Sequence, residues 1–128
     1  MAKNQQEAHL ALKDLLNSLR PAKGVPYAVV GLGFGLTPKH HRVSAEQWGS
    51  APLQRHQIPG LLAHHEKMSI GRIRWHIENY DDLINGVRPM MLLVDGENKY
   101  IVDGCHRTAA LHICGIAEFD YLTINCEQ

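Results

Sequence analysis

The 128-residue sequence lacks any apolar run long enough to cross a membrane, so we expect no membrane-spanning helix. It also lacks an excess of charge of either sign, because Lys plus Arg and Asp plus Glu number 13 each. A dedicated non-specific nucleic-acid binder usually carries a basic excess, so this balance disfavours that class of protein. A local basic patch, and with it a nucleic-acid partner, stays compatible with these numbers.

Cysteines are few, and their spacing fits neither a disulfide framework nor a zinc site. The three are Cys105, Cys114 and Cys126, an odd number without a CxxC pair. The opening "MAKNQQEAHL" has no apolar segment of the kind found in signal peptides. We therefore expect reduced thiols and a cytoplasmic protein. The paired histidines at 40–41 and 64–65 suggest metal binding, but adjacent helical residues point about 100° apart, which favours solvated or partner-facing histidines.

Residues 1–67 are expected to form an N-terminal extension with a helix over 4–20. Asn4 and Glu7 fit a capping box, leucines recur at helical spacing behind them, and Pro21 ends the helix. A strand is expected near 27–31, followed by a glycine-rich turn. The glycines there match a dinucleotide fingerprint only in part, because Leu36 occupies the position of the third glycine.

Two short helices are expected in the rest of this extension. Ser44 and Gln47 form a second capping pair in front of "SAEQW". Pro59 suits the first position of another helix, "PGLLAHHEKM".

Residues 68–128 are expected to form the core of an α+β protein, packed with the extension into one compact domain. In "IGRIRWHI" apolar residues alternate with Arg72, Arg74 and His76, which predicts a strand with a basic outer face. The elements expected after it are a helix at 79–86, a hairpin of 88–94 with 99–102 turning at Asp95-Gly96, a helix at 105–114 ended by Gly115, and a strand at 119–124. The predicted order is β-α-β-β-α-β over residues 70–124.

The chemically dense segment is "KYIVDGCHRTAALHICGI", in which a predicted strand gives way to a predicted helix at Asp103 and Gly104. The first amides of a helix have no intrahelical partners, and the helix dipole attracts anions to them. Arg107 is able to offer a guanidinium fork to a phosphate, and His106 a further donor. The same field is expected to lower the pKa of the Cys105 thiol.

Asp103 has several possible roles at this junction: capping the helix, holding a metal ion on a nucleotide, or accepting a proton. The plainer alternative is an ordinary strand-to-helix turn, with Asp103 as N-cap, Cys105 as a small buried residue and Arg107 in solvent. The close succession of residues 103–107 favours an anion site over that alternative.

Residues 70–124 resemble the ParB/sulfiredoxin superfamily, and "VDGCHRTAAL" carries most of the match. A Gly-Cys-His-Arg run at such a junction is similar to the signature of sulfiredoxins, which reduce a cysteine sulfinic acid with ATP. The resemblance implies that Cys105 is a nucleophile. It also implies that Gly104, His106, Arg107 and Thr108 bind nucleotide phosphate.

A wider set of ParB-like domains, including free-serine kinases, has Asp-Gly-x-His-Arg at this point, and Asp103 matches their catalytic aspartate. This likeness implies ATP or another nucleotide with Mg²⁺, held partly by Asp103. Glu78, or else Glu66, would be the partner carboxylate. Arg72 and Arg74 would meet the phosphates from the opposite wall.

Two functions follow as expectations. The first is ATP-dependent phosphoryl transfer to a small-molecule or protein acceptor, either a sulfinate or a hydroxyl metabolite. The second is a non-catalytic ParB-like binding module, an accessory or phage-type regulator that grips a protein or nucleic acid through residues 1–67. The oligomeric state is open.

Overall fold

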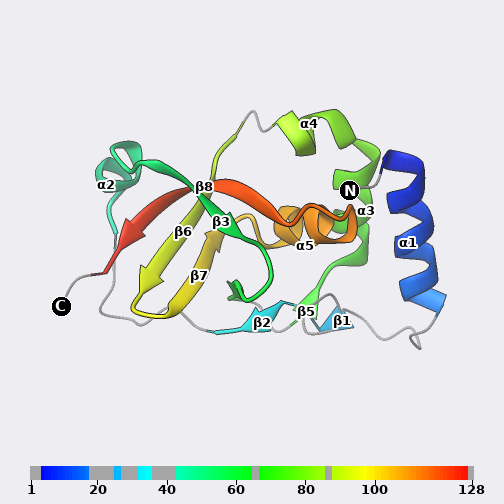
Figure 1. Cartoon of the computed structure of the whole chain (residues 1–128), viewed down its shortest axis with the longest axis horizontal. Coiled ribbons are helices and arrows are strands. Elements are labelled where there is room, and N and C mark those ends of the chain that lie inside the picture. Colours follow the sequence, from blue (N-terminus) through cyan, green and yellow to red (C-terminus); the bar gives the residue numbers. More distant parts are fainter. Residues whose placement is uncertain are drawn as a thin grey trace.

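The computed structural model describes residues 4–17, 25–26, 32–35, 43–64, 67–85 and 88–126, which form a mixed α+β fold (Figure 1). None of the helices in these ranges is long and apolar enough to cross a membrane. The elements in chain order are α1 (Gln5–Asn17), β1 (Val25–Pro26), β2 (Gly33–Phe34), α2 (Ala45–Gly49), β3 (Leu53–Gln57), β4 (Leu62–Ala63), β5 (Lys67–Met68), α3 (Ile70–Glu78), α4 (Tyr80–Asn85), β6 (Met90–Asp95), β7 (Asn98–Asp103), α5 (Cys105–Ile113) and β8 (Glu118–Asn125).

The sheet has six strands in the order β2-β4-β7-β6-β8-β3. The centre is the β6–β7 hairpin, and β8 joins β6 in parallel after the crossover through α5. The short strands β2 and β4 extend the sheet in parallel beyond β7, and β3 closes the other edge antiparallel to β8. β1 and β5 form a separate antiparallel pair.

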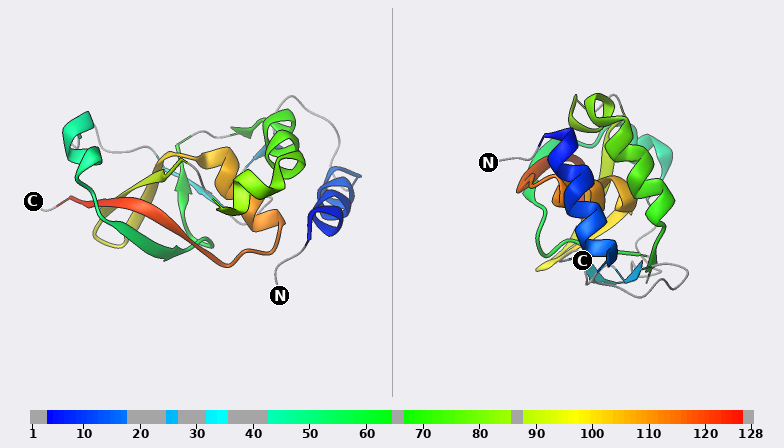
Figure 2. Two further views of the ribbon diagram at one scale, coloured as in Figure 1. Left: turned by 90° about the horizontal axis from the view of Figure 1, so that it is seen from above. Right: turned by 90° about the vertical axis from the view of Figure 1, so that its right-hand side faces the viewer.

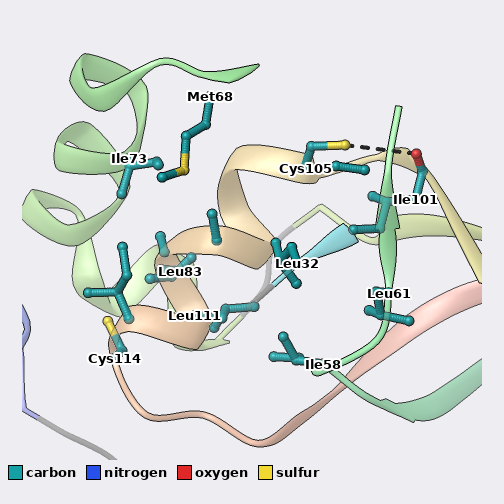
Figure 3. Close-up of a cluster of buried hydrophobic side chains, with 14 of the residues drawn as sticks. Leu32, Ile58, Leu61, Met68, Ile73, Leu83, Ile101, Cys105, Leu111 and Cys114 are labelled. Carbon is teal, nitrogen blue, oxygen red and sulfur yellow. Dashed lines mark hydrogen bonds between the residues drawn. The ribbon is translucent and has the colours of Figure 1, made fainter. Parts of the chain in front are cut away.

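Helix α5 is the centre of the packing. It contacts α3, α4 and α1, and α1 also packs on α3 at the outer end of the molecule (Figure 2). In Figure 3, Met68 and Ile73 lie on the α3 side of α5, and Leu32, Leu61 and Ile101 lie toward the strands. The buried face of α5 is made of small and apolar residues, which allows this close approach on several sides.

Most of the predicted elements downstream of residue 79 are confirmed. The hairpin turns at Asp95-Gly96, where Gly96 has φ of 60°. Helix α5 ends before Gly115, which has φ of 77°. The predicted caps are confirmed upstream as well: the Asn4 Oδ1 atom accepts a hydrogen bond from the Glu7 amide at 2.9 Å, and α2 begins with a complete capping box.

The strand predicted for "IGRIRWHI" is wrong, because residues 70–78 form helix α3. Ile73 and Ile77 are both fully buried, whereas Trp75 is 56% exposed. A pattern of apolar residues at every second position also contains pairs spaced i, i+4, which lie on one face of a helix. Ile73 and Ile77 are such a pair, and α3 packs against α5. The N-cap Ser69, whose Oγ accepts from the Arg72 amide, was the sequence signal for the helix. The predicted core of residues 68–128 therefore does not begin with a strand at 70–77.

The helix predicted from Pro59 is also wrong. Residues 59–60 form a turn in which Gly60 has φ of 92°, and β4 and β5 follow it. Strand β3 was not predicted, because it lies at a sheet edge and buries only the polar His56, so it shows no apolar alternation. The strand expected at 27–31 lies outside the described residues, and β2 occupies 33–34, where a turn was expected.

Candidate functional site

The β7–α5 junction depends on Gly104. Its φ of 109° and ψ of 23° place it in the left-handed region as the N-cap of α5, and no side chain caps the helix. Asp103 is therefore not the N-cap. A Cβ atom at Gly104 would lie 2.5–2.9 Å from atoms of the buried Met90 side chain. Glycine thus serves both the turn and the close approach of β6, and the first α5 amides lack a side-chain acceptor.

A pocket of about 220 Å³ opens in front of this junction. Its walls come from α3, the segment before β6, the end of β7 and the first turn of α5, and guanidinium and imidazole groups dominate them. The lining residues are Arg72, His76, Arg88, Asp103, Gly104, Cys105, His106 and Arg107. The pocket therefore combines five basic side chains with one carboxylate.

The basic side chains of this pocket lie close enough to lower one another's pKa values. Arg107 is half-buried and donates a hydrogen bond from Nη1 to the Arg88 carbonyl oxygen. Burial lowers the pKa of Arg107; nearby Asp103 opposes that shift, and Arg88 adds to it. Burial likewise lowers the pKa of His76, and Arg107 and Arg72 lower it further.

No carboxylate in the described part of the chain forms an ion pair with Arg72, Arg88 or Arg107. The ion pair found there joins Arg55 to Asp120 at 3.1 Å. Within the described ranges, the three guanidinium groups around the pocket thus keep their charge available for an outside anion.

His106 lines the pocket but has a structural task as well. Its Nε2 atom accepts a hydrogen bond from the Ser69 amide at 2.9 Å, which ties the start of α5 to the start of α3. Because Nε2 is a hydrogen-bond acceptor here, the predicted donation from His106 to a phosphate would have to come from Nδ1.

Cys105 lies at the back of the junction, and the predicted lowering of its thiol pKa is wrong. The side chain is 4% exposed, and burial raises the pKa of the thiol to about 11, although a hydrogen bond with His64 opposes the shift. The Sγ atom lies 3.3 Å from His64 Nδ1 and donates weakly to the Ile101 carbonyl oxygen at 3.8 Å (Figure 3). Desolvation thus outweighs the field of the helix.

Cys126 should therefore be the first of the three cysteines to be alkylated in the folded protein. Cys126 is only partly buried, whereas Cys105 and Cys114 are buried. With a thiol pKa of about 11, Cys105 is roughly one part in a thousand thiolate at pH 8. Iodoacetamide labelling with mass-spectrometric mapping checks this order, and labelling in denaturant gives the reference rate. Cys105 reacting before Cys126 below pH 8 contradicts it.

His64 was not predicted as a partner of Cys105. Its Nδ1 atom lies 2.9 Å from the Ile101 carbonyl oxygen, so the imidazole and the thiol share one acceptor. The sequence signal was the pair at 64–65, which was interpreted as solvated or partner-facing. A separation of 41 residues gave no reason to connect His64 with Cys105.

Three residues predicted for the site lie elsewhere. Thr108 is fully buried, and its Oγ1 atom hydrogen-bonds the Tyr121 hydroxyl at 2.8 Å, so it does not face the pocket. Arg74 is exposed on α3 and is not a lining residue, because two helical positions separate it from Arg72 by about 200°. Glu78, at the other end of α3, lines a separate hollow with Gln5. Glu66 lies outside the described residues.

Arg88 is a member of the pocket that the sequence did not single out. It precedes β6 by two positions, and the only local signal was an arginine before Pro89 at the start of a predicted strand. A second hollow of about 410 Å³ adjoins the pocket through His76, Arg88 and Arg107. Its other lining residues are Trp75, Asn79, Asp82 and Leu83.

Within the ranges that the structure describes, no group of three or more His, Cys, Asp or Glu side chains is placed to hold a metal ion. Comparison of the chain with family models, with curated proteins and with solved structures finds no match. The fold and the pocket therefore define a small α+β protein with a basic pocket at a strand–helix junction.

Proposed function

We propose that this protein binds a nucleotide or another phosphate ligand at the head of α5 and uses it in ATP-dependent phosphoryl transfer. The observation that carries the proposal is the convergence of Arg72, Arg88 and Arg107 on one pocket without a partner carboxylate on any of them in the described ranges. Such a cluster is costly when empty, because like charges repel. A phosphate in the pocket offsets that repulsion with charge-assisted hydrogen bonds.

The backbone supports the same ligand class. The uncapped first turn of α5 aims amide groups and the positive end of the helix dipole at the pocket. Gly104 itself lines the pocket, so its backbone is open to a phosphate there. If β5 and α4 are left aside, the chain order β4-α3-β6-β7-α5-β8 matches the β-α-β-β-α-β order of a ParB/sulfiredoxin-like protein, with β4 and not residues 70–77 in the first position.

Among the described residues that line the pocket, Asp103 is the one with a carboxylate, and it would weaken anion binding unless it had a cation or a proton to hold. Mg²⁺ bound with nucleotides takes one or two protein carboxylates and otherwise phosphate oxygens and waters. A single aspartate therefore fits this ion, whereas a dedicated protein cage would need more ligands. Asp103 would hold Mg²⁺ on the phosphates, and the ion would supply charge neutralisation there.

The surroundings of Cys105 favour a kinase-like route to a small hydroxyl acceptor over a sulfiredoxin-like route to a sulfinate. A thiol nucleophile reacts as the thiolate, and burial keeps Cys105 protonated at neutral pH. Asp103, in contrast, is exposed at the mouth of the junction, where an acceptor hydroxyl can reach it.

The second candidate is a ParB-like module that binds the phosphate ligand without turning it over and regulates a protein or nucleic-acid partner. Its support is the position of Glu78 away from the pocket, so that Asp103 is the one carboxylate that the described part of the chain contributes there. Binding of ATP or CTP with Mg²⁺, measured by calorimetry, tests the site. Nucleotide hydrolysis or transfer, measured alongside, separates the two candidates.

Asp103→Asn should reduce any ATP turnover by about a hundredfold or more, whereas Cys105→Ser should leave most of it. Both changes keep the side-chain volume nearly constant, so thermal melting should report folded proteins. Steady-state phosphate release from the two variants measures the difference. Turnover lost in Cys105→Ser and kept in Asp103→Asn restores the thiol route. Wild-type binding without turnover leaves the regulatory module.

A further inference from the structure

The hollow next to the basic pocket has a different chemical character. It shares His76, Arg88 and Arg107 with that pocket, so the two adjoin along these three residues. At about 410 Å³ it is the larger of the two, and Trp75 and Leu83 contribute an apolar wall. A phosphate group gains no binding energy from an apolar wall. The hollow therefore suits the organic part of a phosphate ligand.

Trp75 is the main feature of this wall. Its side chain is 56% exposed on α3, although Ile73 and Ile77 on the same helix are fully buried. The indole meets the His76 imidazole edge to face, with ring centroids 5.2 Å apart and an interplanar angle of 80°. This contact sets the orientation of an indole that is still open to a flat ring.

The two polar residues that line this hollow but not the basic pocket, Asn79 and Asp82, provide hydrogen-bond acceptors. The Asn79 side chain donates through Nδ2 to the Trp75 carbonyl oxygen at 2.8 Å, which leaves its Oδ1 atom as an acceptor. Asp82, from α4, adds a carboxylate to the lining. Two acceptors of this kind match the amino group of a heterocyclic base and disfavour a carbonyl in the same place.

We propose that the hollow holds the amino-bearing base of a nucleotide, with its ring against Trp75 and its exocyclic amine donating to Asp82 or Asn79. This proposal rests on the proposed function, because the phosphates must lie among Arg72, Arg88 and Arg107. The Asp82 carboxylate repels phosphate, and the three guanidinium groups attract it, so the ligand has one orientation. Adenine and cytosine share the required amine, and their deaminated counterparts carry a carbonyl instead.

Binding of paired nucleotides by the full chain tests the proposal. Calorimetry compares ADP with inosine diphosphate and CDP with uridine diphosphate, and pyrophosphate probes the phosphate site alone. Wild type should prefer the amino member of at least one pair by about tenfold. Trp75→Ala should weaken that nucleotide about tenfold and leave pyrophosphate unchanged. Asp82→Ala should abolish the preference within the pair.

Matched variants keep the result interpretable. Asp81→Ala removes the neighbouring exposed carboxylate, which does not line the hollow, and should keep the preference. Leu10→Ala removes another apolar side chain that is 56% exposed, from α1, and should keep the affinity. Trp75 fluorescence provides a readout beside affinity, because the other tryptophan, Trp48, is buried on α2. The preferred nucleotide should quench it, and pyrophosphate should not.

Each other outcome has a defined meaning. Pyrophosphate binding with no preference in either pair overturns the base site and leaves the phosphate site. Asp82→Ala that strengthens both members of a pair equally shows charge repulsion only and overturns amine recognition. Failure of both pyrophosphate and all four nucleotides to bind overturns this proposal together with the proposed function.

Discussion

Arg107→Ala should lower the affinity of the protein for ATP and for pyrophosphate by about ten- to hundredfold. Arg107 lies in the first turn of α5, faces the pocket and is held beside Arg88 by a hydrogen bond to its carbonyl oxygen. Loss of a charge-assisted bond of this type costs about 1.5–3 kcal/mol of binding free energy. Calorimetric titration measures the loss, and unchanged affinity for both ligands contradicts the role of Arg107.

Two variants serve as controls for this prediction. Arg74→Ala removes an exposed arginine of α3 that does not line the pocket, so affinity should stay close to that of wild type. Arg107→Lys keeps the charge but not the planar fork, so its affinity should fall between wild type and Arg107→Ala. Equal losses in Arg74→Ala and Arg107→Ala would indicate a general charge effect.

The pH dependence of binding gives a second readout of the same cluster. Arg107 and Arg72 help to lower the pKa of His76 in the free protein, after burial itself. A bound anion favours the imidazolium, so binding should raise the pKa of His76 and take up protons. Affinity is then greatest at acid pH and falls as the pH rises through the His76 pKa of the complex. Calorimetry in buffers of different ionisation enthalpy measures the uptake, which Arg107→Ala should reduce.

The sequence predicted the elements whose signals are local. The Asp95-Gly96 turn sits between two apolar strands, and Gly115 marks the end of α5, so both boundaries depend on nearby residues. Helix α3 was missed because its buried pair, Ile73 and Ile77, satisfies both helical and alternating spacing. Packing of this pair against α5, together with the N-cap Ser69, selects the helix.

The part of the site that is contiguous in the chain was predictable from local signals, and Arg72 was predicted through the family resemblance. Gly104 and Arg107 were found because one strand–helix turn places both at the pocket. Arg88 and Trp75 come from other elements, and their approach depends on how α3 and β6 pack around α5. Cys105 was placed at the correct turn, but its burial beside His64 reverses the direction of its pKa shift. Burial is a property of the tertiary structure and does not follow from helix position.

Gly104→Ala should lower the free energy of unfolding by about 2–5 kcal/mol. Two costs add at this position. The φ of 109° is a conformation that residues with a Cβ rarely adopt. The new methyl group would also lie 2.5–2.9 Å from atoms of Met90, which is 1% exposed and has little room to move. Urea denaturation of wild type and variant measures the difference.

Gly60→Ala separates these two costs. Gly60 has a similar φ of 92°, but no atom lies within 4 Å of its virtual Cβ, so only the backbone cost of about 1–3 kcal/mol applies. Adding Met90→Ala to Gly104→Ala removes the Met90 Cγ and Sδ atoms, which lie 2.5 and 2.7 Å from the virtual Cβ, and leaves the Met90 Cβ atom at 2.9 Å. The double variant should therefore lose less stability than the sum of the two single variants. Additive losses, or equal losses in Gly60→Ala and Gly104→Ala, would contradict the close packing of β6 on this junction. Gly104→Ala should also weaken phosphate binding. The added methyl group would distort the β7–α5 turn, which directs the first α5 amides toward the pocket.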